Sequence, residues 1–465
     1  MTRLAILLAL FCALPAPADD ARPLARIAFG CCSDQDKPLP IFDKIADLKP
    51  DLYLATGDNI YVDLKREPGL DEMANMKAKY DRLAALPGWQ RLAKTCPMLA
   101  TWDDHDYGKN DVGVEYPHKD ESQQLHLDFF GVPKDSPRRA QKGVYNAKVI
   151  GPEGKRVQVI LLDNRYFRSK LKKDTRPVPG TRIVPYLPNT DPDATMLGPE
   201  QWRWLEDQLR QPAELRLLVS SIQVIADEHP HEKWANLPLE RDRLYKFLRD
   251  TKAGGVVILS GDRHLGEISM DPKAVGYPLF DVTSSGLNQG AKTWRGPTEP
   301  NRHRVAVMSH GDNFGFLTID WSAADPTVSV QVRDVDGAIA LKETFPLGIL
   351  QPGAAVAELP HAPGAGAISP RDALKKVGQK VVVEMTVQAT GQPKGGGRVF
   401  LNSEKDFRSD LNFTVVLNAG ALKGKWARES FKDKVIRVTG TVSEFRGSPQ
   451  IQVDDEKQIE LIKAD

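Results

Sequence analysis

The chain has 465 residues, which is too long for one ordinary hydrophobic core and is typical of two or three domains. Its 63 Lys and Arg residues nearly balance its 62 Asp and Glu residues. This balance excludes a global electrostatic attraction as the basis for binding nucleic acid or an anionic membrane.

Residues 1–18 have the pattern of a Sec-type signal peptide. Arg3 precedes an apolar run from Leu4 to Leu14, and the small residues Ala16, Pro17 and Ala18 follow. The run is shorter than the about 20 apolar residues that a membrane-spanning helix needs. We therefore expect an extracytoplasmic protein, periplasmic or secreted, with no integral membrane segment after cleavage.

Residues 24–350 alternate short apolar runs with segments of helical periodicity, which predicts an α/β domain. The predicted strands are rich in Val, Ile and Leu, as expected of strands covered on both faces. They are ARIAFGCC, DLYLATGD, PMLATWDD, VQVILLDNR, LRLLVSSIQV and GVVILSGDRH. Between them, KPLPIFDKIADLKPD and GPEQWRWLEDQLRQ predict helices. The periodicity of the second helix predicts core positions at Trp202, Trp204, Leu205 and Leu209.

Residues 351–370 are rich in Ala, Gly and Pro and predict a linker. Residues 371–465 form a second predicted domain, in which β-rich segments are separated by Gly, Asn and Pro. Five strands in a segment of this length suggest a small β-barrel.

Candidate metal ligands follow four of the predicted strands. They lie in the segments GCCSD at 30–34, GDNIY at 57–61, TWDDHDY at 101–107 and SGDRH at 260–264. Because α/β folds bind ligands at the carboxyl ends of their strands, we expect these side chains to meet. The third segment crowds three carboxylates beside His105, which requires cations or shifted pKa values.

The ligand types predict two unlike metals. Carboxylate oxygen suits a hard cation, whereas imidazole, phenolate and thiolate suit iron or zinc. Asp58 is the natural bridging ligand. Two metals about 3.5–4 Å apart can supply a hydroxide and neutralise phosphoryl oxygens during in-line displacement. His105 is then placed to protonate the leaving alkoxide.

Six motifs, GDNIY, ATWDDHDYGKND, LLDNRYFR, SSIQV, EKWANLP and LSGDRH, occur in this order. Together they resemble the PhoD-type alkaline phosphatases of the metallophosphoesterase superfamily, over about residues 26–348. The resemblance implies a sandwich of two β-sheets flanked by helices, a centre of Fe³⁺ and Ca²⁺, and hydrolysis of phosphate monoesters and diesters. The implied iron ligands are Cys32, Asp58, Tyr61 and His264. The implied calcium ligands are Asp104 and Asp262, with Asp58 shared, although Asp103 is an alternative to Asp104.

Two departures from the family pattern carry expectations of their own. The family usually has Gly-Ser-Cys where this chain has Gly30-Cys31-Cys32, so Cys31 occupies the Ser position and is left free to form a disulfide with Cys96. The family is also commonly exported by the twin-arginine route, but Arg3 is the one arginine before the apolar run. This departure suggests export in the unfolded state, with metals loaded outside the cytoplasm.

Three arginines near the motifs are candidates for binding the phosphoryl group, since guanidinium forks match phosphate geometry. They are Arg165, the first choice and a catalytic candidate, Arg168 and Arg263. The alternative for Arg168 and Arg263 is that they form ordinary ion pairs. His229 and His231 lie in a predicted loop and either line the pocket or are solvated.

The C-terminal segment resembles an OB-fold barrel. Such barrels often bind nucleic acid or another polymer through aromatic and cationic side chains. The candidates here are Phe400, Phe407, Trp426, Arg437, Phe445 and Arg446. The alternative, which we favour, is that the aromatic side chains fill the barrel interior.

The combined motifs predict an exported, metal-dependent phosphatase or phosphodiesterase that hydrolyses phosphate esters. One alternative is a phosphodiesterase specialised for a polymer or a lipid headgroup, with little activity on monoesters. Another is a non-catalytic surface protein whose fold is stabilised by metals. A zinc protease or a serine hydrolase is disfavoured because the chain has neither a His-Glu-x-x-His nor a Gly-x-Ser-x-Gly motif.

Overall fold

A computed structural model describes residues 22–293, 299–308, 310–354, 368, 370–374, 376–393, 397–404, 406–409, 412–418, 431–432, 434–445 and 448–462. The chain divides into two compact units, residues 1–355 and 356–465. The predicted signal peptide and most of the predicted linker lie outside the described residues. Within the described ranges, no helix is both long and apolar enough to cross a bilayer.

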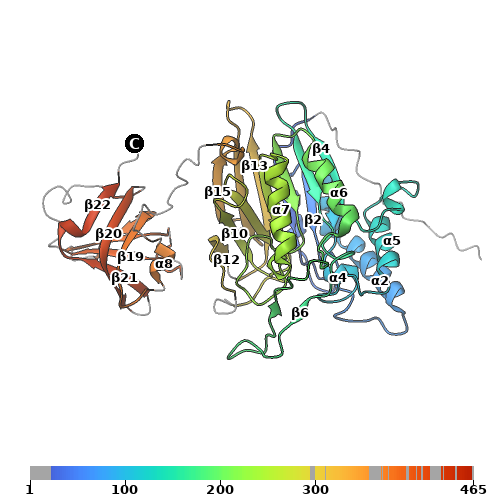
Figure 1. The fold of residues 1–465 in the computed structure, drawn as a ribbon, viewed down its shortest axis with the longest axis horizontal. Coiled ribbons are helices and arrows are strands. Elements are labelled where there is room, and N and C mark those ends of the chain that lie inside the picture. Colours follow the sequence, from blue (N-terminus) through green and yellow to red (C-terminus); the bar gives the residue numbers. More distant parts are fainter. Residues whose placement is uncertain are drawn as a thin grey trace, which may run out of the picture. The chain divides into compact units, whose positions relative to one another are not determined.

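The first unit is built on two mixed β-sheets (Figure 1). One sheet has the strand order β15 (Ile339–Pro346), β14 (Thr327–Asp334), β13 (Asn313–Asp320), β1 (Arg26–Gly30), β2 (Leu52–Thr56) and β3 (Met98–Thr101). The other has the order β12 (Arg304–Met308), β10 (Gly266–Asp271), β11 (Leu279–Ser284), β9 (Val256–Ser260), β8 (Leu215–Val219), β5 (Val157–Leu161) and β4 (Asn146–Ile150). A short hairpin, β6 (Lys172–Lys173) and β7 (Tyr186–Leu187), stands apart from both sheets.

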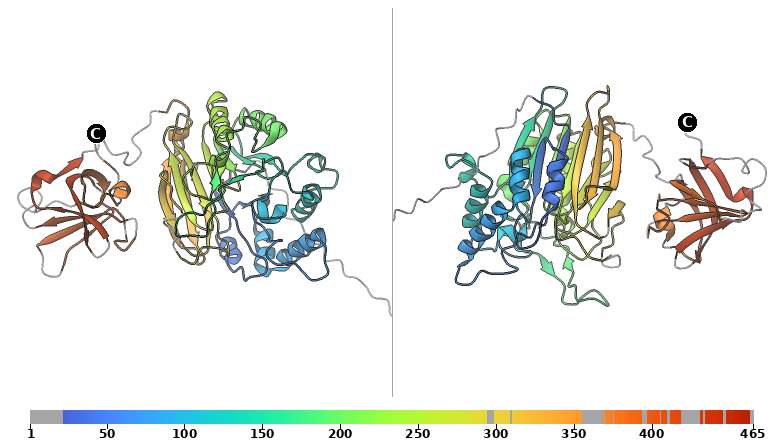
Figure 2. Two further views of the ribbon diagram at one scale, coloured as in Figure 1. Left: turned by 60° about the horizontal axis from the view of Figure 1, so that its bottom comes forward. Right: turned by 180° about the vertical axis from the view of Figure 1, so that it is seen from behind.

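Helices cover both outer faces of this pair of sheets, with the blue helices on one side and the green α6 and α7 on the other (Figures 1 and 2). The α-helices are α1 (Ile41–Asp47), α2 (Glu72–Ala85), α3 (Pro87–Thr95), α4 (Asp104–Tyr107), α5 (Lys119–Phe129), α6 (Gly198–Leu209) and α7 (Pro238–Asp250). Short 3-10 turns are η1 (Pro137–Arg139), η2 (Trp234–Asn236) and η4 (Leu347–Leu350). Apolar side chains of α1, α2 and α3 pack on the first sheet in one core cluster with Tyr53 and Phe314.

The six predicted strands of this unit are confirmed as β1, β2, β3, β5, β8 and β9, and the two predicted helices as α1 and α6. Trp202, Leu205 and Leu209 are buried, as their helical spacing predicts. Trp204 is only half-buried, because it lies on the flank of the apolar stripe, where its ring packs on Tyr145.

The strand directions bring the motifs together at one edge. β1, β2 and β3 run parallel in one sheet, and β5, β8, β9 and β11 run parallel in the other. A bridge between Cys31 and Ser285, just beyond the ends of β1 and β11, joins the carboxyl ends of the two sheets. The segments that follow these strands therefore converge on one site.

The described residues of the second unit form seven strands, two more than the five predicted. They are β16 (Lys380–Thr386), β20 (Val435–Phe445), β21 (Ser448–Val453), β19 (Thr414–Asn418), β18 (Arg398–Asn402) and β17 (Ala389–Gly391) in spatial order, with β22 (Ile459–Ile462) paired to β20. The remaining elements are α8 (Pro370–Leu374) and the 3-10 turn η6 (Glu456–Gln458).

Two predicted segments each break into two strands. The first breaks after β16, where the backbone N–H of Gln388 donates to Asn402 O and turns the chain toward β18. The last breaks after β21, where the Gln458 side chain accepts hydrogen bonds from the N–H groups of Asp454 and Asp455. Each break redirects backbone hydrogen bonds that a continuous strand would use.

The aromatic residues of this unit divide between core and surface. Phe413 and Phe431 lie in the core cluster. Phe407 and Phe445 are 63% and 60% exposed, so the expectation that they fill the interior is wrong, and Phe400 is half-buried. Arg437 pairs with Glu384 and Glu460. Trp426 and Arg446 lie outside the described residues.

Candidate metal centre

Four of the predicted ligands converge at the ends of β1, β2 and β9. The Cys32 Sγ lies 3.3 Å from Asp58 Oδ2, and the Tyr61 hydroxyl donates to the same oxygen over 3.3 Å. The Tyr61 hydroxyl is also 3.3 Å from His264 Nε2. A thiol, a carboxylate, a phenol and an imidazole thus surround one point, which is the donor set expected for iron or zinc.

Four of the candidate ligands, including Asp262 but not Tyr61, have an uncommon backbone conformation. Cys32, Asp58, Asp262 and His264 have φ angles of 66°, 46°, 67° and 56°, in the left-handed region. A non-glycine residue there costs on the order of 1–3 kcal/mol and persists only where its surroundings impose it. At His264 the backbone N–H donates to Ser285 Oγ over 2.8 Å. Such strain is concentrated at functional sites and supports a functional role for these four residues.

Gly57 allows this arrangement. Its φ is 123°, and a Cβ at this position would lie 2.7 Å from Asp103 Cβ, closer than packed carbon atoms approach. A side chain here would therefore push the Asp58 and Asp103 segments apart.

A second group of donors begins at α4. Donor atoms of Asp58, Asp104 and His105 lie within 4.8 Å of one another, as do those of Asp104, Asp111 and Glu232. The Asp104 carboxylate accepts hydrogen bonds from the N–H groups of His105 and Asp111, over 2.8 and 2.7 Å. Asp104 is therefore shared between a cluster that includes the His105 imidazole and a cluster made only of carboxylates, and the carboxylate cluster suits a hard cation.

The geometry separates Asp103 from Asp104. Asp103 Oδ1 accepts from Arg165 Nε over 2.7 Å and from a second Arg165 nitrogen over 2.5 Å. Its Oδ2 is buried without a hydrogen-bond partner among the described residues. Because Arg165 neutralises Asp103, the geometry favours Asp104 as the ligand.

Asp262 lies beside these clusters. Among the described side chains, it belongs to none of the groups whose donor atoms lie within 4.8 Å of one another. Its Oδ2 is 3.2 Å from an Arg263 nitrogen, and its N–H points to Cys31 Sγ over 3.4 Å. Burial and the charges of Asp104 and Glu232 outweigh Arg263 and raise the pKa of Asp262 to about 6.

The protein groups alone do not balance the negative charge. Burial, followed by the charges of Cys32 and Asp104, raises the pKa of Asp58 well above its usual value. Burial and the charge of Glu232 raise the pKa of Asp111 to about 7. Although burial opposes ionisation, the hydrogen bond from Cys31 and the charge of His264 hold the pKa of the Cys32 thiol well below its usual value. The donor set therefore fits bound cations, which would restore charge balance.

His105 is oriented by a carboxylate. Its Nδ1 lies 2.5 Å from Asp63 Oδ1, and the ring packs beside Tyr61 with centroids 4.3 Å apart. Burial opposes protonation, but Asp104 and Asp63 raise the pKa of His105 to about 10. The contact with Asp63 thus places an oriented, protonatable imidazole beside the candidate metal ligands.

The three candidate arginines are engaged by protein groups. Arg165 and Arg168 are fully buried and both contact Glu232, over 2.7 and 3.1 Å. Arg263 is 6% exposed and pairs with Glu299 over 2.5 Å as well as with Asp262. This geometry favours a role in positioning carboxylates around the centre over direct contact with a substrate.

Sequence reasoning assigned no role to three carboxylates of the site. Asp111 and Glu232 stand in the motifs ATWDDHDYGKND and EKWANLP, which were the available signals. Asp63 follows the GDNIY motif by two residues and has no comparable signal. Each joins the site through loop packing that no local pattern encodes.

The expected disulfide between Cys31 and Cys96 is wrong, because both are free thiols in the structure. Cys31 Sγ instead lies 3.1 Å from Cys32 Sγ, beside the candidate ligands. Cys96 follows α3 and packs in the core cluster formed with α1 and α2. The number of cysteines in a sequence gives no information about the distance between any two of them. In the fold, Cys31 and Cys96 belong to different clusters and do not pair.

Comparison with known proteins links these motifs to one family. The description PhoD-like phosphatase matches residues 27–274. Alkaline phosphatase D of Bacillus subtilis (strain 168) is 23% identical over 290 residues, 54% of this chain and 47% of that protein. The chain thus spans about half the length of this curated relative. A solved structure of PhoD shares the fold, with a TM-score of 0.56 at 16% identity over 72% of this chain and 71% of that chain.

Proposed function

Because the chain belongs to the PhoD-like phosphatase family, we propose that it hydrolyses phosphate esters at a centre for two unlike metals. The observation that carries the proposal is the convergence of Cys32, Tyr61 and His264 on Asp58, with Asp104 and His105 on its other side. The sequence resemblance suggests Fe³⁺ at the first position and Ca²⁺ at the second. The thiol, phenol and imidazole donors support iron, and the carboxylates of the second group support calcium.

When bound, two metals would neutralise phosphoryl oxygens and lower the pKa of a nucleophilic water. The residues of the chain would supply the alignment, the proton transfer and the positioning of carboxylates. Asp58 contacts both donor groups and would align them, and His105, oriented by Asp63, would donate a proton to the leaving alkoxide. Arg165 and Arg168 hold Asp103 and Glu232 in place around the centre.

The test of this function uses the protein without residues 1–18. The substrates are p-nitrophenyl phosphate for monoester hydrolysis and bis(p-nitrophenyl) phosphate for diester hydrolysis. Chelator treatment is expected to abolish turnover and to lower the melting temperature, because the carboxylates then repel one another without counter-ions. Restoring iron and calcium should recover both. A visible absorption band from a Tyr61 phenolate on iron gives a readout that does not depend on turnover. Unchanged activity and stability after complete metal removal would contradict the two-metal proposal.

We also propose that the two sheets form a metallophosphoesterase sandwich and that the protein is exported through residues 1–18, as the sequence suggests. For the C-terminal unit we propose an OB-like barrel. The parallel pairing of β19 with β21 and the antiparallel pairing of β16 with β20 support it, because they describe one mixed sheet.

We propose that this barrel contacts a polymeric substrate through the exposed rings of Phe407 and Phe445. Replacing both with serine is expected to weaken binding of a fluorescent single-stranded oligonucleotide by about thirtyfold or more, since each of the two rings would contribute about 1–3 kcal/mol of stacking per base. Leu239→Ser, at an apolar residue of the first unit that is 48% exposed, is the matched control. Equal dissociation constants for the double variant and the wild type would refute this role.

A further inference from the structure

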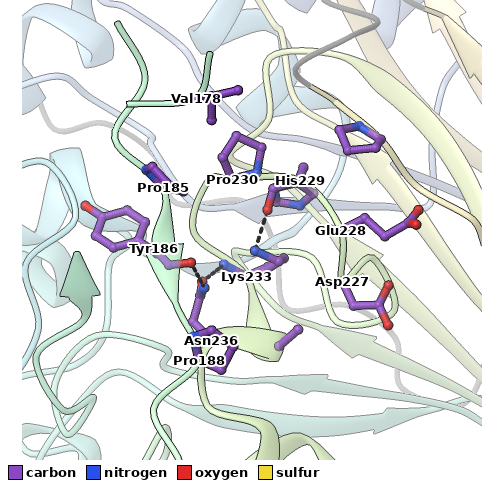
Figure 3. A pocket seen from close by; sticks show the side chains of 12 residues that line it. Val178, Pro185, Tyr186, Pro188, Asp227, Glu228, His229, Pro230, Lys233 and Asn236 are labelled. Atoms are coloured by element: carbon purple, nitrogen blue, oxygen red, sulfur yellow. Dashed lines mark hydrogen bonds between the residues drawn. The ribbon is translucent and has the colours of Figure 1, made fainter. Parts of the chain in front are cut away.

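A pocket of about 350 Å³ lies between the β6–β7 hairpin and the loop that precedes α7 (Figure 3). Its volume is at the lower end of the about 300–1,000 Å³ typical of small-molecule sites, which limits a ligand to one or two rings. Four prolines, Pro185, Pro188, Pro230 and Pro300, contribute to its wall.

The pocket adjoins the candidate metal centre. Tyr186 lines it, and the Tyr186 hydroxyl donates to Asp111 Oδ2 over 2.5 Å. The Asp111 N–H in turn donates to Asp104 Oδ2. Lys233, another lining residue, directly follows Glu232 of the second donor group. Tyr186 and the Glu232–Lys233 segment therefore belong to both the pocket wall and the surroundings of the candidate metal centre.

Polar atoms of the pocket wall have unmet hydrogen-bonding capacity. His229 is 2% exposed, and neither of its ring nitrogens has a hydrogen-bond partner among the described residues. The same holds for Asp227 Oδ1, which is also buried. Each unsatisfied buried polar atom costs about 1–3 kcal/mol. Two such side chains in one pocket wall indicate a polar ligand or ordered water.

Two charged side chains of the pocket wall, Asp227 and Lys233, already have partners, which disfavours a second phosphate as this ligand. Asp227 Oδ2 pairs with Arg302 and lies 3.6 Å from an Arg241 nitrogen, so Asp227 offers the pocket only Oδ1, which accepts hydrogen bonds and does not attract an anion. The cation Lys233 is already occupied, because its Nζ donates to the carbonyls of His229 and His231 over 2.5 and 3.0 Å. The complementary group is neutral and carries hydroxyl donors.

The pocket is preformed. The Asn236 side chain accepts from the Lys233 N–H over 2.8 Å and donates to Tyr186 O over 3.3 Å (Figure 3). The Tyr186 N–H donates to Pro230 O over 2.9 Å, which fixes the hairpin to the loop. A rigid wall with proline faces and a few polar atoms suits a ring that has an apolar face and a hydroxylated edge.

We propose that this pocket binds the sugar ring of a sugar phosphate ester, with hydroxyl groups bonded to His229 and Asp227, and so selects the alcohol part of the substrate. This inference rests on the proposed phosphatase function and specifies its substrate class. His229 and Asp227 are then residues that determine specificity, separate from the metal ligands.

The test compares kcat/KM for ribose 5-phosphate with kcat/KM for phosphoethanolamine, which has no ring. Ala235→Phe fills the pocket, because Ala235 lines it. His229→Phe keeps the ring and removes both nitrogens. In each variant the ratio of the two kcat/KM values is expected to fall about tenfold or more, as for the loss of one to two buried hydrogen bonds. Ala324→Phe, at an exposed alanine, is the matched control and should leave the ratio unchanged.

A second measurement separates failure of the subsite from failure of the function. Saturation-transfer NMR on metal-loaded protein, with methyl β-D-ribofuranoside as the probe, requires no turnover. Signal from the wild type that disappears in Ala235→Phe supports the subsite even if no ester is hydrolysed. An unchanged kcat/KM ratio, or equal NMR signal in the wild type and Ala235→Phe, would show that the pocket holds water alone and would overturn the inference.

Discussion

Replacing Asp58 with asparagine is expected to lower kcat/KM for bis(p-nitrophenyl) phosphate by about three orders of magnitude, equivalent to about 4 kcal/mol of activation free energy. Asp58 Oδ2 faces Cys32 and Tyr61, and Oδ1 accepts from the His105 N–H over 3.3 Å. Asparagine keeps the shape of the side chain but removes the charge and one acceptor oxygen. If Asp58 bridges two metals as proposed, both would lose a ligand, so catalysis should fall far more than it would from the loss of a peripheral contact.

Metal analysis and circular dichroism should accompany the kinetics. The expected result is a folded variant with reduced content of at least one metal. Asp135→Asn, at an exposed carboxylate, is the matched control and should retain wild-type turnover. If Asp58→Asn hydrolyses the diester at the wild-type rate, Asp58 does not bridge two metals and the proposed mechanism is wrong.

Replacing Arg165 with methionine is expected to lower the free energy of unfolding of the first unit by about 3–5 kcal/mol. The Arg165 side chain is fully buried between Asp103 and Glu232, so its loss leaves uncompensated charge on two buried carboxylates. Urea denaturation followed by near-ultraviolet circular dichroism measures the change. The buried Trp102, Trp202 and Trp234 report on this unit.

Arg210→Met provides the comparison. Arg210 pairs with Glu206 on the surface of α6, with side chains 61% and 41% exposed, and its loss should cost about 1 kcal/mol or less. The sequence-based expectation that Arg165 binds substrate makes a different prediction. It would be supported if Arg165→Met kept wild-type stability and raised KM for the phosphate ester.

Local pattern was sufficient to predict the framework of the first unit. The runs around Leu54 and Ile258 are short, apolar and followed by Gly-Asp, so each signals both a buried strand and the site at its end. The second unit was less predictable, because the break at Gln388 depends on a hydrogen bond to Asn402, which is distant in sequence. Hydrophobic periodicity within one segment gives no information about where its partner strand ends.

The composition of the site was predictable to the extent that its residues follow strands. Asp104 and His264 do so, whereas Glu232 lies in a loop and Tyr186 in the β6–β7 hairpin, and the approach of both segments depends on long-range packing. The partners of Arg165 illustrate the limit. The arginine stands out in its motif, but nothing local indicates that Asp103 and Glu232 neutralise it.

The left-handed backbone at Cys32, Asp58, Asp262 and His264 has an evolutionary consequence. Glycine adopts this conformation freely, whereas a non-glycine residue there costs on the order of 1–3 kcal/mol, with Asp toward the lower end. A glycine at one of these positions would thus raise the stability of the fold but remove a candidate ligand side chain. Descendants of this protein that no longer depend on hydrolysis would drift toward glycine at these positions, so glycine there would mark a lineage that had lost the activity.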